Sequence, residues 1–543
     1  MLLPDVLGTF SLQALVSGHY ELLVSLLTAS ALLVVYAAMG ESSCGRGGFP
    51  IANPTRVFEF SSIFRVVAFI RSPRDLLRSF AERYRDTPYW LNMELGKVLV
   101  LPAHMINEIR VNPMMSSLAA IQEVSRAALV QIEMQWKLTL HKVQNGSLKG
   151  FEPIGDVLDD QMLKLVKEHL TTKNMGMCIM IPSISEEVSD SLSLIFSDSS
   201  DWKEFQLGEP IIRLVARTSS RVFGGKTFCR SEAWLKAMAK YTKHFLLASI
   251  TLRFFPTWSK SLVQWILPPC WLLRSNLVNC RRVIEPILEQ RQAEVERAQE
   301  NGEDVEYAFD QALTSLDRDI DMATAHISLA MVAIHTTADL LEKTMLALIE
   351  HDELIEPLRQ EVMSVLSTHG LSNAGLAGLT LMDSVLKETQ RMNPVANSFL
   401  NRIALEDFQL SNGMIIPKGT LLGVGPTHMW DNSFYENGDK FDGYRFLRMR
   451  EDPEKRQQSY LVSTSPHHLG FGHGSHACPG RFFAANEIKI ILCHLLLKYE
   501  WKILGEGPHI INLGVLNAAY PWTKLQIRRR AETLNLDEIL TGH

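Results

Sequence analysis

The chain has 543 residues, with 54 Lys or Arg against 60 Asp or Glu, so its net charge at pH 7 is −6. This balance argues against a protein that binds nucleic acid through the phosphate backbone. Apolar residues make up 46% and charged residues 21%, which excludes a mostly disordered chain. The seven cysteines include no CxxC pair, which excludes a zinc ribbon and a complete disulfide framework. We therefore expect a globular protein in a reducing compartment, with no nucleic-acid partner.

An apolar run at 22–39 is interrupted only by Ser and Thr. As a helix it spans about 27 Å, close to the hydrocarbon thickness of a thin bilayer. No Lys or Arg precedes Arg46, whereas eight Arg lie between Arg46 and Arg85. By the positive-inside rule, 1–21 is lumenal and the bulk of the chain is cytosolic. We predict one transmembrane anchor; the alternative is a cleaved signal peptide, although the basic first region is missing and the apolar core is long.

The rest of the chain is helix-rich. Residues 40–59 are predicted as a linker, 60–530 as one large domain and 531–543 as a tail. A strand is predicted at 97–102, and a hairpin joins 408–410 to 414–417 through Ser-Asn-Gly. The fold class is therefore mainly α with a small β subdomain. Helical periodicity is clearest at 157–170, 184–196, 210–223, 233–252, 281–300 and 322–350.

The strongest local signal is the sequence FGHGSHACPG at 471–480, which is followed by an apolar helix at 487–499. Cys478 precedes this helix, whose N-terminus favours a thiolate. The glycines allow the backbone to lie flat under a planar cofactor. A lone cysteine held in this way suits the fifth ligand of a haem iron, where thiolate donation favours O–O cleavage. The alternative is a buried structural cysteine in a Gly-rich loop.

The loop resembles the haem-binding loop of the cytochrome P450 family, and HACPGRFFA is most similar to members from filamentous fungi. The resemblance covers about 60–530 and implies the P450 fold, a haem cofactor and Cys478 as its axial ligand. His476 stands where many members carry an Arg to a haem propionate, and a His is a weaker, pH-sensitive donor. The four residues that carry the pattern F-x-x-G-x-x-x-C-x-G are Phe471, Gly474, Cys478 and Gly480.

Two further motifs match the family in order and spacing. Glu388 and Arg391 share one helix face at i, i+3, a pairing that alone is common on solvated helices. Arg445 in FDGYRF resembles the Arg of the family's P-x-R-F element, although Gly443 replaces the proline. The resemblance implies a buried Glu388–Arg391–Arg445 network that braces the cysteine loop, a task that suits the planar fork of Arg.

The helix at 322–350 carries AIHTT at its centre, which resembles the family's oxygen-activation segment. Thr336 matches the threonine whose hydroxyl bonds oxygen and water in the family. His335 replaces the usual acid; it either carries the proton relay or only packs. Arg402 resembles a strand Arg that binds haem propionates. The segments implied to face substrate are apolar or small, which suits a lipophilic ligand: 113–123, the helix around Met331 and Ile334, 395–400 and 516–520.

The resemblance implies a monooxygenase of the endoplasmic reticulum membrane with its catalytic domain in the cytosol. It would take electrons from an NADPH-dependent cytochrome reductase and oxidise a lipophilic secondary metabolite of terpenoid, meroterpenoid or indole-diterpene type. Two alternatives stay open: a haem-thiolate isomerase or dehydratase that needs no O2, and a catalytically dead haem-binding product.

Residues 124–144 are an insertion relative to family members of this type. The insertion has 21 residues, or 63 nucleotides, and its sequence is compatible with common splice signals at both ends. It is either a retained intron translated in frame or a genuine helical insertion.

Overall fold

The computed structural model describes residues between 44 and 538. The predicted lumenal segment 1–21, the anchor 22–39 and the insertion 124–144 therefore lie outside the described residues. Across the described part of the chain, we find no helix with the length and apolar character that a membrane crossing needs. Within these limits the structure leaves out 57–58, 60–61, 111, 118, 121–147, 156, 158, 170–175, 253–254, 256, 302–312, 314–320, 507–508, 533 and 537.

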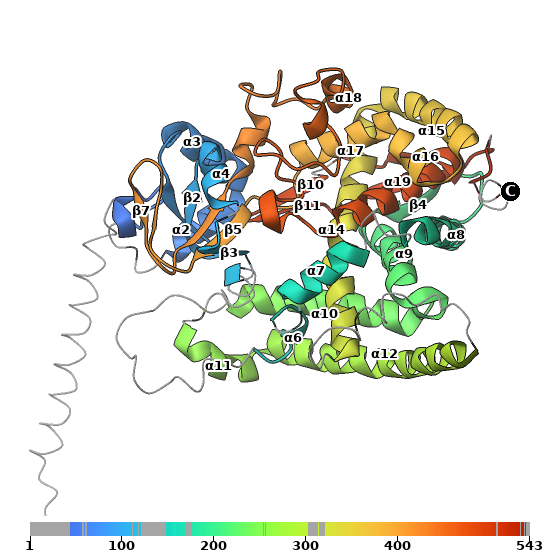
Figure 1. Cartoon of the computed structure of the whole chain (residues 1–543), viewed down its shortest axis with the longest axis horizontal. Helices are drawn as coiled ribbons and strands as arrows, with labels where there is room; N and C mark the ends of the chain where they lie inside the picture. The colour runs from blue at the N-terminus through green and yellow to red at the C-terminus, as the bar shows by residue number, and fades with distance from the viewer. Residues whose placement is uncertain are drawn as a thin grey trace, which may run out of the picture.

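Most of the helices gather in one part of the molecule, while α2, α3 and α4 lie with the largest sheet in another (Figure 1). Each helix predicted from periodicity overlaps an observed one, and the helix predicted at 322–350 has the observed bounds. The helices are α2 (Ile63–Arg71), α3 (Pro73–Arg83), α4 (Ile106–Ile109), α6 (Glu152–Gly155), α7 (Asp160–His169), α8 (Gly176–Phe196), α9 (Gly208–Cys229), α10 (Glu232–Leu252), α11 (Thr257–Ile266), α12 (Pro268–Asn301), α14 (Met322–Glu350), α15 (Ile355–His369), α16 (Asn373–Gly378), α17 (Thr380–Met392), α18 (Arg445–Met449) and α19 (Arg481–Lys498).

The largest sheet in the described residues has the order β1-β2-β8-β5-β3, and a smaller one has the order β4-β12-β9. The predicted hairpin is confirmed as β6–β7, with Phe408 opposite Ile416. The remaining pair is β10–β11. The strands are β1 (Tyr89–Met93), β2 (Gly96–Leu101), β3 (Met115–Ser116), β4 (Lys203–Gln206), β5 (Phe399–Ala404), β6 (Phe408–Gln409), β7 (Ile415–Ile416), β8 (Leu421–Val424), β9 (Tyr499–Ile503), β10 (Ile510–Leu513), β11 (Leu516–Ala519) and β12 (Lys524–Arg529).

Helix α14 runs through the middle of the helical part (Figure 1) and packs against α9, α12, α17, α19 and β11. Most of its residues are buried, as expected for a helix that is apolar on nearly all sides. The side chain of Asp321 caps its first turn by accepting from the Ala323 N–H at 3.1 Å. At its centre, however, Val332 and Thr336 are exposed. One stripe of the central helix is therefore open to a ligand.

Candidate active site

The loop around Cys478 is closed by a backbone hydrogen bond, which the Cys478 N–H donates to the carbonyl of Phe471 at 2.8 Å. Gly474 has φ +84°, in the left-handed region that favours glycine. A Cβ at this position would also lie 2.7 Å from the Arg110 carbonyl oxygen at the end of α4. The glycine spacing of the motif therefore lets the loop fold tightly against α4.

The electrostatics of Cys478 combine two opposing effects. Burial raises the pKa of its thiol, while the N–H groups of Gly480 and Arg481 and the Arg481 charge lower it. The predicted N-terminal effect of α19 is therefore present, because the helix begins at Arg481. Burial outweighs it, so a cation at the sulfur is needed to hold the thiolate. An iron would supply that charge.

Glu388, Arg391 and Arg445 form the network that the motifs predicted. Arg391 donates to both carboxylate oxygens of Glu388, through Nε at 2.8 Å and Nη2 at 2.7 Å. Arg445 donates through Nε to the same two oxygens at 3.1 and 3.2 Å. The side chains of Glu388 and Arg391 are 0% exposed and that of Arg445 is 6% exposed. One carboxylate thus joins α17 to the start of α18.

The two arginines also hold the chain that leads to the cysteine loop. Arg391 donates to the carbonyls of Met429, Gly438 and Lys440, and Arg445 to those of Glu436, Asn437 and Lys440. The Leu469 N–H in turn donates to the Met429 sulfur at 3.4 Å, two residues before Phe471. The network therefore reaches the loop through one intermediate segment, as a brace would.

Two candidate groups for proton transfer, Thr336 and His335, lie at the centre of α14. The Thr336 hydroxyl donates back to the Val332 carbonyl at 2.9 Å, and the Ala333 carbonyl lies 3.5 Å from the same oxygen. Such back-bonding leaves the hydroxyl a free lone pair and tends to bend a helix. Burial lowers the pKa of the His335 imidazole and so favours its neutral form. A neutral imidazole can accept one proton and donate another.

Arg402 is the clearest unsatisfied group in this region. It lies on β5, which pairs irregularly with β8 between Phe399 and Arg402, with Leu400 at φ +52°. Such a bulge redirects the side chains that follow it. Arg402 is 3% exposed and donates through Nη1 to the Asn401 carbonyl at 2.9 Å. In the described part of the chain its Nε and Nη2 have no hydrogen-bond partner, and burial lowers its pKa to about 10.

Sequence reasoning missed a contact between buried His473 of the loop and partly buried Arg110 at the end of α4. His473 is 8% exposed, its Nδ1 lies 3.1 Å from the Thr464 hydroxyl and its Nε2 lies 3.4 Å from Arg110 Nη1. The position of His473 inside the motif was visible, but its partner is 363 residues away in the sequence. His476, the predicted propionate donor, is exposed in the short 3-10 helix η6 (Gly474–His476).

The predicted residues thus divide into two groups. Arg391 and Arg445 each contact Glu388 directly. Cys478, Thr336 and Arg402 come from three different elements and share no hydrogen bond among the described residues.

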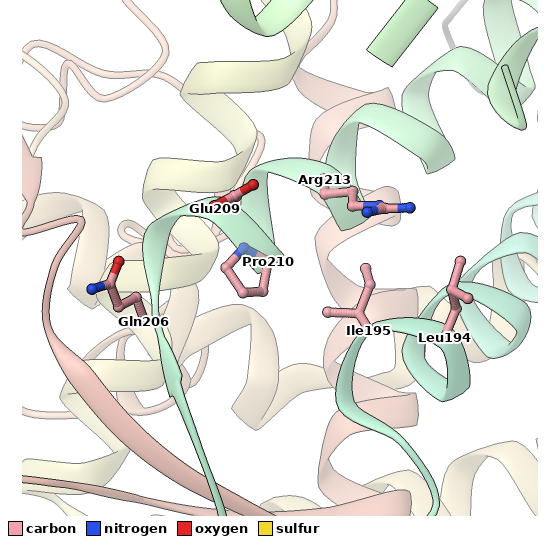
Figure 2. Close-up of a pocket in the computed structure, with 6 residues that line it drawn as sticks. All are labelled: Leu194, Ile195, Gln206, Glu209, Pro210 and Arg213. Atoms are coloured by element: carbon pink, nitrogen blue, oxygen red, sulfur yellow. The ribbon is translucent and has the colours of Figure 1, made fainter. Parts of the chain in front are cut away.

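A surface pocket between α8, β4 and α9 lies apart from these residues (Figure 2). Leu194 and Ile195 at the end of α8 face Pro210 and Arg213 of α9 across it. Leu194 is 60% exposed, so the pocket is a shallow surface feature. None of the predicted site residues lines it, and we do not assign it to the reaction.

Comparison with known proteins decides the family. The family model described as Cytochrome P450 matches residues 157–522. The chain belongs to the cytochrome P450 family. It is 38% identical over 499 residues to the cytochrome P450 monooxygenase eqxH of Fusarium heterosporum, covering 90% of this chain and 92% of that protein. It is 41% identical over 400 residues to the cytochrome P450 monooxygenase ptmU of Penicillium ochrochloron, covering 72% and 78%.

A third relative is cytochrome P450 monooxygenase 1 of Gibberella fujikuroi, 36% identical over 456 residues, or 83% of this chain and 99% of that protein. This P450 is therefore an oxidoreductase of the monooxygenase family, whose cofactor is a thiolate-ligated haem. The observed residues fit that cofactor. The N–H groups of Gly480 and Arg481 and the Arg481 charge favour a thiolate at Cys478, and the Nε and Nη2 of buried Arg402, unpartnered among the described residues, suit a propionate.

Proposed function

We propose that this P450 hydroxylates or otherwise oxidises a lipophilic intermediate of fungal secondary metabolism, of terpenoid, meroterpenoid or indole-diterpene type. It would use O2 and electrons from an NADPH-dependent cytochrome reductase. The observation that carries the proposal is Arg402, a buried cation on β5 whose Nε and Nη2 have no hydrogen-bond partner among the described residues. Such a group is costly to leave unpaired, so an anionic ligand is its natural partner.

In this proposal each residue has one task toward the haem. Cys478 ligates the iron, Arg402 and His476 hold the propionates, and Phe471, Gly474 and Gly480 shape the loop around the cysteine. Glu388, Arg391 and Arg445 brace the segment before that loop. When bound, the haem supplies the iron centre at which O2 is activated.

Thr336 and His335 would handle protons on the open stripe of α14. The Thr336 hydroxyl donates its hydrogen bond to the Val332 carbonyl, so its oxygen lone pair is available to accept a hydrogen bond from a water. His335 is held neutral by burial and can pass a proton along the helix. The exposed Val332 side chain beside them favours an apolar ligand over that stripe.

Membrane association belongs to the same proposal, with 22–39 as a single-pass anchor in the endoplasmic reticulum. Large apolar side chains on the end of α10, on α11 and on the start of α12 support it. These helices pack against one another at the edge of the molecule (Figure 1). Trp and aliphatic residues on such a surface suit a lipid interface. The exposed residues, which we call the apolar edge, are Leu246, Leu247, Ile250, Leu262, Trp265, Ile266, Trp271 and Val278.

The decisive test replaces the proposed ligand by its oxygen analogue, Cys478→Ser. We expect the native protein, purified with haem, to give the red-shifted ferrous–CO band of a thiolate-ligated haem. The variant should lose this band and its NADPH-dependent turnover, because a serine hydroxyl does not replace the thiolate. An unchanged band in the variant would contradict the assignment of Cys478.

Assays on the same purified protein distinguish the two alternative functions. Product that forms without NADPH and O2 would favour an isomerase or dehydratase. A normal thiolate band with no turnover of any lipophilic candidate would favour a catalytically dead haem protein. The replacement of the usual acid by His335 is the feature that keeps the first alternative open.

A further inference from the structure

A buried ion pair lies one turn beyond Thr336 on α14 and has no task in the scheme above. Lys343 Nζ is 2.6 Å from Asp339 Oδ2, and the two side chains are 0% and 13% exposed. A buried ion pair of this kind is weak evidence for stability, because the desolvation of both charges offsets their attraction. Its contacts therefore need another explanation.

The pair reaches out of the helix to two distant segments. Lys343 Nζ donates to the Asn517 carbonyl at 2.8 Å and lies 3.3 Å from the Pro394 carbonyl. Asp339 Oδ1 accepts from the Ala519 N–H at 3.0 Å. All three protons of the ammonium thus have acceptors, and both carboxylate oxygens are used.

The two segments are also bonded to each other. The Asn397 N–H donates to the Val515 carbonyl at 2.8 Å, and its side-chain amide donates to the Gly514 carbonyl at 2.7 Å. The Asn517 N–H donates to the Val395 carbonyl at 3.4 Å. Residues 394–397 and 514–519 therefore form one unit, here called the two-segment unit, which the ion pair attaches to α14.

We propose that Asp339 and Lys343 are positioning residues that hold the two-segment unit at a set place beside the Thr336 turn and thereby set the size of ligand that fits there. The inference rests on the proposed function, because it takes the open stripe of α14 as the reacting side. Thr336 is exposed three residues before Asp339, and Leu516 of the two-segment unit is 38% exposed. Movement of the unit would change the space above the stripe.

The test uses the haem-loaded full chain and two azoles that report through the haem absorption band. Imidazole is small and clotrimazole is bulky. In Lys343→Met the ion pair and both carbonyl contacts are lost, so the two-segment unit loosens. We expect clotrimazole to bind about tenfold more weakly, because a large ligand must now order the unit itself. Imidazole binding should change less than twofold.

A matched control is available in Lys489→Met. Lys489 is also buried, lies 2.6 Å from buried Asp383 and donates to a backbone carbonyl, that of Leu376, at 3.0 Å. In Lys489→Met the ratio of clotrimazole affinity to imidazole affinity should equal that of the native protein. If Lys343→Met fails to fold, the double variant Asp339→Leu with Lys343→Met removes both charges while keeping an apolar core, and it should show the same ratio change.

The outcomes separate the two proposals. An unchanged clotrimazole-to-imidazole ratio in a variant with an intact thiolate CO band contradicts the positioning role alone. An equal change in Lys489→Met also contradicts it, because the effect would then be a general loss of stability. Absence of the thiolate band from the native protein contradicts the proposed function instead.

Discussion

Glu487 is a carboxyl group buried in α19 that has no cationic partner within the residues the structure describes. Its Oε1 accepts from the hydroxyls of Thr218 at 2.6 Å and Ser219 at 2.8 Å, both on α9. Its Oε2 has no hydrogen-bond partner among the described residues. Burial raises its pKa from 4.5 to about 7, against the smaller opposing effect of the two hydroxyls. The folded protein therefore keeps a proton that the unfolded chain releases.

This residue predicts a pH dependence of stability. Between pH 4.5 and 7 the folded state binds more protons than the unfolded state at Glu487, so stability falls as the pH rises through that window. The total effect is on the order of 3 kcal/mol. Glu487→Gln should remove this contribution, so that urea unfolding at pH 5 and pH 8 shows a smaller difference than in the native protein. If the stability difference between pH 5 and pH 8 were the same in both proteins, the ionisation of Glu487 would not affect the free energy of unfolding, and the prediction would be wrong.

At the scale of single residues, the sequence identified groups that belong to motifs and missed groups defined by distant partners. Glu388 and Arg391 were visible because they lie one turn apart. The two carbonyls that Lys343 contacts lie 51 and 174 residues away, and no local pattern indicates them. Gly443 was visible only as a departure from proline. In the structure a Cβ there would lie 2.6 Å from the Cδ1 atom of Leu354, so a larger residue would require that side chain to move.

The junction of α17 with α18 depends on Arg445. Arg445→Leu leaves the buried Glu388 carboxylate with one cation instead of two, and it frees the carbonyls of 436 and 437, whereas the carbonyl of 440 keeps its hydrogen bond from Arg391. We expect a loss of about 3–5 kcal/mol of stability, together with a lower haem content. Thermal unfolding and the haem absorbance per protein measure both effects. Arg445→Lys should recover little, since an ammonium lacks the planar fork.

The neighbouring Arg448 provides the control. Arg448 lies on the same short helix as Arg445 and forms an ion pair with Asp442, but its side chain is 59% exposed. Arg448→Leu should cost less than about 1 kcal/mol and leave the haem content unchanged. Equal losses in the Arg445 and Arg448 variants would contradict a special role of the buried network.

At the scale of elements, periodicity predicted the helices well, because each buries one face against a common core. The bounds of α14 were predicted to the residue, and the β6–β7 hairpin followed from its Ser-Asn-Gly turn. The sheet order β1-β2-β8-β5-β3 could not be predicted from the sequence, because β8 pairs with β2 across more than 300 residues. The bulge in β5 that redirects Arg402 is equally a product of strand pairing.

For the molecule as a whole, the apolar edge predicts membrane binding that does not need the anchor proposed at 22–39. A chain that begins at residue 44 should still bind phosphatidylcholine vesicles in a flotation assay. Trp265→Ser combined with Trp271→Ser should weaken this binding about tenfold, because two large apolar side chains are lost from the interface. Trp522 is 61% exposed outside the apolar edge. Trp522→Ser should bind as the native chain does, and equal weakening would contradict the assignment.

The unpaired guanidinium of Arg402 has a consequence beyond the reaction itself. Without haem, folding buries a cation whose Nε and Nη2 have no acceptor in the described part of the chain, which costs folding free energy. A ligand that binds only the native state shifts the unfolding equilibrium in proportion to its free concentration. The abundance of intact enzyme in a cell should therefore follow the supply of iron and porphyrin, and scarcity of either would send more of the chain to proteolysis.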